Sequence, residues 1–137
     1  MLFRSPVKGQ YAPVIGVFQR QKKTGNKLTI VGDGNQRRDF VHVSDVVNAN
    51  IIASTKQFDE WQIDGTKHTI YKYGQIYNIG SGKNYSINEI ASMISEDTIH
   101  VEPRVGEAKI TLADISKTTR QLGWTPKIDL KVWIKDN

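Results

Sequence analysis

Residues 36–47 read Gln-Arg-Arg-Asp-Phe-Val-His-Val-Ser-Asp-Val-Val, and this stretch decides the fold. The run at 40–43 is rich in strand formers, and an apolar run of this length suits a buried strand. Ser44 and Asp45 are good N-cap residues, and apolar positions then recur at helical spacing over residues 46–53. The stretch therefore predicts a cationic loop, a buried strand and an amphipathic helix in succession.

Arg37 and Arg38 are the residues of this stretch that point to chemistry. A guanidinium presents a planar fork of donors that fits phosphate oxygens. On spacing alone, a phosphate ligand and a surface arginine paired with Asp33 or Asp39 are equally good interpretations. A second cationic loop contains Arg104, and two arginines that converge on one pocket would suit a diphosphate. Separate surface roles are the alternative.

The composition indicates one soluble domain. The chain has 137 residues, 38% of them hydrophobic, which is enough for a single core. It carries 19 Lys and Arg against 14 Asp and Glu, a charge of +5 that suits an anionic ligand. The basic residues are scattered and not interleaved with aromatics, so nucleic acid is not the expected partner. No cysteine is present, and no apolar run reaches membrane-spanning length, which favours a cytoplasmic protein without membrane contact.

Strands and helices alternate along the chain, so the fold class is α/β, with a small mixed sheet and flanking helices. Strands are expected at residues 28–31, 40–43, 75–79 and 99–101, and helices at 11–21, 45–54, after a capping box at 86–89, at 114–122 and from 130. Asp33-Gly34 predicts a tight hairpin between the first two strands, with an open loop as the alternative. Residues 56–73 have little periodicity and read as a surface insertion.

Gly80-Ser81-Gly82-Lys83 lies between a predicted strand and a helix, as a phosphate cradle would. The spacing of a P-loop is absent, and Tyr85 stands where a dinucleotide fingerprint needs its third glycine. We therefore interpret it as a structural turn. The three histidines are scattered and no nucleophile elbow occurs, so neither a catalytic residue nor a metal site is predicted.

Residues 28–47 resemble the C-terminal half of nucleotide-sugar epimerases and dehydratases, which are NAD-dependent extended short-chain dehydrogenases. Further motifs match in the family's order at residues 77–82, 103–107, 113–117 and 122–126, and residues 13–15 resemble the start of an earlier helix of the family. The resemblance covers nearly the whole chain and treats residues 56–73 as an insertion. It implies the substrate-binding portion of an extended Rossmann-type enzyme, similar to UDP-glucose 4-epimerase. A dTDP- or GDP-sugar 4,6-dehydratase is the alternative.

The resemblance also implies a substrate-binding set. Two arginines would hold the diphosphate, a glutamate would lie near the ribose hydroxyls, and three further residues would surround the nucleobase. By position, these are Arg38 and Arg104, then Glu107, then Thr29, Val31 and Val14.

Two motifs of the family are missing from the sequence. Neither the Gly-x-x-Gly-x-x-Gly turn that binds NAD nor Tyr-x-x-x-Lys is present. We therefore expect residues 1–137 to be one substrate-binding region, inactive alone, of an enzyme whose N-terminal Rossmann half binds NAD. That enzyme would work through a transient 4-keto sugar, and a homodimer is one option for its assembly. Without the parent sheet, the helix at 45–54 would expose an apolar face. A stand-alone binder of nucleotide sugars or anions is the rival hypothesis.

Overall fold

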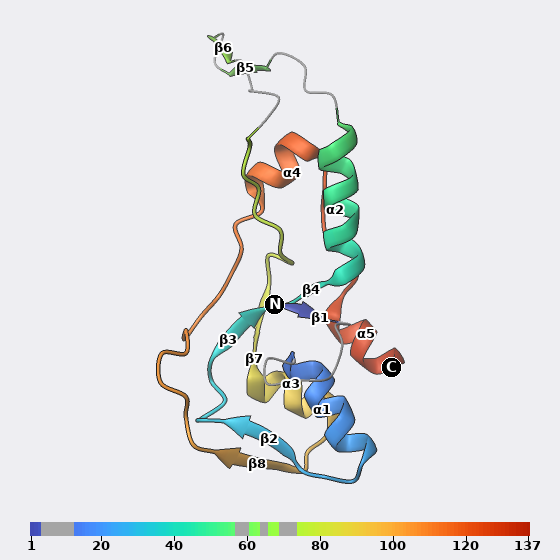
Figure 1. Ribbon diagram of the computed structural model, residues 1–137, viewed down its shortest axis with the longest axis vertical. Helices are drawn as coiled ribbons and strands as arrows, with labels where there is room; N and C mark the ends of the chain where they lie inside the picture. Colours follow the sequence, from blue (N-terminus) through green and yellow to red (C-terminus); the bar gives the residue numbers. More distant parts are fainter. Residues whose placement is uncertain (4–12, 57–60, 64–65, 69–73) are drawn as a thin grey trace.

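The computed structural model describes residues 1–3, 13–56, 61–63, 66–68 and 74–137. The helices are α1 (Val14–Lys23), α2 (Val43–Thr55), α3 (Ile87–Ile94), α4 (Ser116–Leu122) and α5 (Leu130–Asp136). Helices α1, α3 and α5 lie toward one end of the molecule, and α2 and α4 lie toward the other (Figure 1). Within the described ranges, no helix combines the length and apolar character needed to cross a membrane.

The described strands form pairs of both kinds. The strands are β1 (Leu2–Phe3), β2 (Leu28–Val31), β3 (Arg37–Asp39), β4 (Val41–His42), β5 (Trp61–Ile63), β6 (Thr66–His68), β7 (Asn84–Ser86) and β8 (Thr98–Val101). β1–β4 and β2–β8 are parallel, whereas β3–β7 and β5–β6 are antiparallel. The prediction of an α/β fold with mixed pairing is confirmed. The predicted insertion at 56–73 lies largely outside the described residues, apart from the β5–β6 pair.

The tight hairpin expected at Asp33-Gly34 is wrong. β2 pairs with the distant β8, beginning with Leu28 opposite Thr98, and β3 pairs with β7. The chain turns after β2 with a positive φ of 65° at Gly32 and then continues without folding back. Arg37 and Arg38 consequently lie in strand β3 and not in a loop, a second correction.

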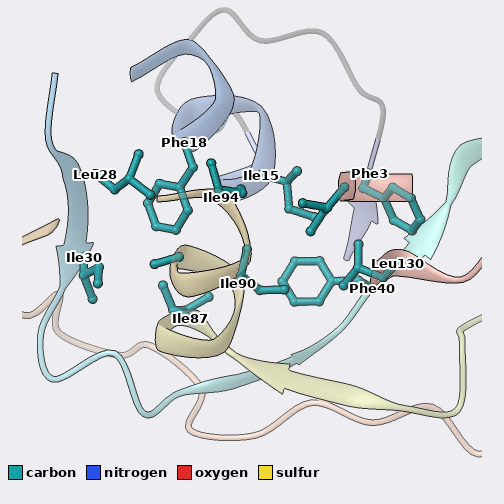
Figure 2. Close-up of a cluster of buried hydrophobic side chains, with 12 residues drawn as sticks. Phe3, Ile15, Phe18, Leu28, Ile30, Phe40, Ile87, Ile90, Ile94 and Leu130 are labelled. Carbon is teal, nitrogen blue, oxygen red and sulfur yellow. The ribbon is translucent and has the colours of Figure 1, made fainter. Parts of the chain in front are cut away.

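The main hydrophobic core lies between α1, α3 and the β2 strand. Phe18, Leu28 and Ile90 are completely buried at its centre, where Figure 2 shows their side chains directed toward one another. Phe40 extends the same cluster toward α5, although β4 covers only Val41 and His42 of the predicted run. Each such side chain contributes about 1.5 to 3 kcal/mol by burial. This core fixes β2, whose end carries the site described below.

A second, smaller cluster joins α2 to α4. It consists of Ala49, Leu122 and Trp124, with Tyr77 packed against it. The indole Nε1 of Trp124 donates a hydrogen bond to the carbonyl oxygen of Asp45 at 3.1 Å. The second cluster therefore depends on contacts between segments that are far apart in the sequence.

The predicted N-cap of α2 is wrong by one or two residues. The helix begins at Val43, and its N-cap is His42, whose Nδ1 accepts a hydrogen bond from the Ser44 amide at 3.1 Å. Asp45 lies inside the helix, where its buried carboxylate accepts hydrogen bonds from the amides of Lys127 and Ile128. A buried carboxylate needs donors of this kind, and here they come from a distant segment.

Residues 75–79 do not form the predicted strand. They have no ladder partner within the described part of the chain, and side chains of α4 bond their carbonyl groups instead. Thr118 Oγ1 donates to the Asn78 oxygen at 2.6 Å, and Lys117 Nζ donates to the Ile76 oxygen at 2.9 Å. The helix itself starts at Ser116, two residues after the predicted start at residue 114, with Ile115 at the N-cap position.

The capping box at the start of α3 is confirmed. Ser86 Oγ accepts from the Glu89 amide, and the Glu89 carboxylate accepts from the Ser86 amide at 2.6 Å. The Ser86 amide, followed by smaller contributions that include Arg37, holds the pKa of Glu89 below its ordinary value of 4.5.

We expect Glu89→Gln to reduce the free energy of unfolding by about 0.5 kcal/mol at pH 7, because the glutamine retains an acceptor but loses the charge. Since the pKa of Glu89 is lowered in the folded state, its contribution is complete above pH 4.5 and is lost as the pH falls through the folded value. Urea unfolding of both proteins at pH 7 and pH 3 should show a smaller difference at pH 3 than at pH 7. An equal difference at both values would contradict the assignment.

Candidate functional site

An open cleft of about 1160 Å³ lies between the segment that follows β2 and the segment that follows β8. Its lining residues are Val31, Gly32, Asp33, Asn35, Gln36, His100, Val101, Glu102, Pro103, Arg104, Glu107, Ala108, Lys109 and Ile110. Because β2 and β8 are parallel, their carboxyl ends meet at one edge, and both segments leave the sheet there. The sequence indicated the segment after β2 and the segment around Arg104 separately. The pairing of β2 with β8 brings the two together.

The two segments are also joined by polar contacts. The Gly32 amide donates to the Val101 oxygen at 2.9 Å, and His100 Nδ1 lies 2.7 Å from the Gly32 oxygen. A carbonyl oxygen only accepts, so the His100 ring donates its proton from Nδ1. These contacts fix the base of the cleft independently of any ligand.

Arg38 and Glu107 form an ion pair beside the cleft. Arg38 Nη2 lies 3.1 Å from Glu107 Oε1, while Nη1 donates to the carbonyl oxygen of Arg37 at 2.9 Å. Arg38 is 8% exposed and is not among the residues that line the cleft, whereas Glu107 does line it. Glu107 is thus the member of this ion pair that lines the open space.

Arg104 lies in the loop that precedes Glu107 and is exposed to the cleft. It has no ion pair or side-chain hydrogen bond with any residue that the structure describes. Asp33 and Glu102 also line the cleft, so the wall is not uniformly cationic. Hydrogen bonds from Asn35 lower the pKa of Asp33 and favour its charged form, and the backbone amide of Asn35 contributes more than its side chain. An anionic ligand in the cleft must therefore be bound by individual basic side chains and not by a uniformly positive wall.

Of the other residues implied by the resemblance, Val31 lines the cleft and Thr29 lies two positions before it on β2. Thr29 accepts a hydrogen bond from the Gln21 amide group at its Oγ1. Val14 packs against the main core at the start of α1 and is not among the lining residues. The structure therefore brings Arg104, Glu107 and Val31 together at the cleft, with Arg38 paired to Glu107, whereas Thr29 and Val14 are not among the lining residues.

Arg37 has a different environment from its neighbour. Its Nε and Nη2 donate to the side chain and backbone of Asn84, and its Nη1 lies 3.0 Å from Glu89 Oε2. These contacts join β3 to β7 and α3, and Arg37 is not among the residues that line the cleft. Spacing in the sequence could not distinguish Arg37 from Arg38. In strand β3 successive side chains point to opposite faces, so the two arginines have different partners.

The glycine turn at residues 80–82 binds the carboxylate of Asp39, a residue of this same chain. The Asp39 carboxylate accepts hydrogen bonds from the amide and hydroxyl of Ser81, each at 2.7 Å, and from the Gly82 amide at 3.1 Å. A Cβ atom added at Gly80 would lie 2.7 Å from Asp39 Oδ2. The prediction of a structural turn agrees with this arrangement, because an internal carboxylate fills the place of a phosphate.

Comparison with known proteins adds independent information. Residues 4–137 match the family model described as GDP-mannose 4,6 dehydratase. The chain is 38% identical over 138 residues to a protein of Methanocaldococcus jannaschii named after UDP-glucose 4-epimerase. That alignment covers 96% of this chain and 39% of the relative, so the chain spans about two fifths of its length.

The solved structures of similar fold include two 4-epimerases with bound ligands. A UDP-glucose 4-epimerase from Thermotoga maritima, in complex with UDP-glucose, superposes with a TM-score of 0.80 at 27% identity, over 98% of this chain and 41% of the other. A UDP-glucuronic acid 4-epimerase from Bacillus cereus, in complex with UDP-glucuronic acid and NAD, gives a TM-score of 0.75 at 27% identity, over 90% of this chain and 37% of the other.

Proposed function

Because this chain belongs to the NAD-dependent nucleotide-sugar epimerases and dehydratases, the extended short-chain dehydrogenases, and corresponds to their C-terminal part, we propose that its cleft binds the nucleotide of a nucleotide sugar. The observation that carries this proposal is the convergence of Arg104, Glu107 and Val31 on one cleft, with Arg38 paired to Glu107 at 3.1 Å. The complexes of similar proteins with UDP-glucose and UDP-glucuronic acid support a UDP-sugar as the first candidate.

The proposed roles follow from the chemistry of each side chain. Arg104 would bind the diphosphate directly, since its guanidinium faces the cleft without a protein partner among the described residues. Glu107 would accept hydrogen bonds from the ribose hydroxyls, and Val31 and Thr29 would lie beside the base. Arg38 would reach the diphosphate once Glu107 turns toward the ribose. The assignment of Val14 to the base pocket stays a prediction.

Calorimetric titration of the 137-residue chain with UDP-glucose, UDP, UMP and inorganic pyrophosphate tests the proposal. We expect saturable binding of UDP-glucose and UDP, and weaker binding of UMP because it has one phosphate fewer. Absence of UDP and UDP-glucose binding at millimolar concentrations would reject a binding site in this chain. Equal affinity for all four ligands would reject recognition of a nucleoside diphosphate.

Glu107→Gln should increase the affinity for two ligands to different extents. The substitution frees the Arg38 guanidinium from a competing carboxylate, so inorganic pyrophosphate should bind about three- to tenfold more tightly. UDP should gain less, because the charged acceptor for the ribose hydroxyls is lost at the same time. Titration of both ligands into both proteins gives the comparison. A uniform change for pyrophosphate and UDP would contradict a ribose contact by Glu107.

NAD is the cofactor of this family, and similar structures contain it. The residues of this chain do not fit it: the sequence lacks the glycine pattern of a dinucleotide site, and Asp39 fills the one glycine turn that follows the extended segment 75–79. We therefore propose that the NAD site and the catalytic Tyr-x-x-x-Lys belong to an N-terminal Rossmann half. This chain alone would be inactive, and the intact enzyme would work through a transient 4-keto sugar.

The surface of α2 supports a partner of this kind. Val47 and Ile51 are one helical turn apart and are 52% and 55% exposed, whereas Asp45 and Ala49 on the other side are buried. The expected exposure of an apolar face on this helix is confirmed. In the intact enzyme, we propose that the sheet of the N-terminal half covers Val47 and Ile51. A stand-alone binding module, with its own core and no catalysis, is the alternative.

A further inference from the structure

Asp39 is a buried carboxylate that holds two distant segments together. Besides the three hydrogen bonds from the glycine turn, its Oδ2 accepts one from the Ala113 amide at 3.1 Å. It is 4% exposed, and its own amide donates to Thr111 Oγ1 at 3.2 Å. Charge-assisted bonds from several donors make such a carboxylate a strong anchor.

The segment anchored by Asp39 continues from the loop of the cleft. Residues 102–113 run along the side of the molecule from β8 toward α4 (Figure 1). After Glu107, this segment lies beside β3, because the Arg37 amide donates to the Lys109 oxygen at 2.8 Å and the Thr111 amide donates to the Arg37 oxygen at 3.0 Å. At the end of this segment, Ala113 is attached through Asp39, the residue next to Arg38 in the strand.

We infer that Asp39 is a positioning residue of the nucleotide cleft, an inference that rests on the proposed function. By anchoring Ala113 and Thr111 to β3, Asp39 sets the position of the loop that carries Arg104 and Glu107 relative to Arg38. The other end of this loop is fixed by β8, so loss of the Asp39 contacts loosens one end only, which the two Arg37 backbone hydrogen bonds would then hold. The anchor also explains the glycine at position 80, where a Cβ would lie 2.4 Å from the Cβ of Ala113.

Asp39→Asn is the test, and Asp45→Asn is its matched control. Asparagine has one acceptor oxygen in place of two, and its NH₂ group would face backbone amides. Asp45 is also a buried carboxylate that accepts two backbone amides, but those amides belong to residues 127–128, away from the cleft. Both substitutions should destabilise the protein, and only Asp39→Asn should weaken UDP binding, by about tenfold.

Two measurements separate positioning from a general loss of structure. Under conditions where each variant is folded by circular dichroism, UDP affinity is measured in a cycle with Arg104→Ala. If Asp39 acts through the loop, Arg104→Ala should cost much less in the Asp39→Asn protein than in the wild type. Hydrogen exchange without ligand should be at least tenfold faster at residues 102–113 in Asp39→Asn and not in Asp45→Asn.

The outcomes distinguish the two proposals. If the wild type does not bind UDP, the proposed function fails, while faster exchange confined to 102–113 would still identify Asp39 as the anchor of that loop. Unchanged exchange there, or full UDP affinity in folded Asp39→Asn, would overturn the inference. If Asp39→Asn does not fold, Thr111→Val tests the second contact between Asp39 and this segment, because it removes the acceptor of the Asp39 amide and leaves the carboxylate in place. It should give faster exchange at residues 102–113 with about a threefold loss of affinity.

Discussion

Arg38→Ala should lower the affinity for UDP about 100-fold, the largest effect expected at the cleft. Arg38 is nearly buried and its guanidinium contacts Glu107, a residue of the cleft wall, so a diphosphate that takes the place of Glu107 would gain about 1.5 to 3 kcal/mol for each charge-assisted hydrogen bond. A 100-fold loss corresponds to about 2.7 kcal/mol. Calorimetry with UDP measures it, and Arg38→Lys, which retains the charge but not the fork, should lose about tenfold.

Lys27→Ala is the matched control for charge. It removes one positive charge from an exposed pair with Asp97, in which both side chains are 61% exposed, and should change UDP affinity less than twofold. Arg37 is not a suitable control, because its contacts with Asn84 and Glu89 join three elements of the fold. UDP affinity within twofold of wild type in Arg38→Ala would show that the ion pair with Glu107 is purely structural.

Local sequence signals predicted the elements whose determinants lie within a single turn. The Ser86 capping box starts α3, and Gly123, with φ of 70°, ends α4 as expected. The failures occurred where strand pairing is decided by distant residues. β2 takes β8 as its partner in place of the hairpin, and residues 75–79 are bonded by α4 side chains, which no short-range pattern reveals.

The same distinction applies to the site. Arg104 and Glu107 could be selected from the sequence because they belong to a recognisable motif, and the structure places both at the cleft. The anchoring role of Asp39 could not be predicted from the sequence, because most of the partners of its carboxylate are backbone amides, which every residue except proline carries. Side-chain identity therefore indicates groups that touch a ligand more readily than groups that hold a loop in place.

Trp124→Ala should lower the free energy of unfolding by about 3 to 5 kcal/mol, the largest effect expected on stability. Trp124 is 1% exposed and forms the second cluster with Ala49 and Leu122, so its removal leaves a cavity. It also leaves the Asp45 oxygen without the indole donor. Urea unfolding followed by far-UV circular dichroism measures the loss. Trp124→Phe, which retains an aromatic ring but not the donor, should lose about 1 to 2 kcal/mol.

This substitution also separates stability from recognition. The second cluster lies between α2 and α4, whereas the cleft is built on β2 and β8 against the main core. Folded Trp124→Ala should therefore bind UDP within twofold of wild type at low temperature, in contrast to Arg38→Ala, which should retain its fold and lose binding. A loss of UDP affinity in folded Trp124→Ala as large as that of Arg38→Ala would mean that the second cluster helps to shape the cleft. Stability and recognition would then share one set of contacts, contrary to the separation of the two clusters in the structure.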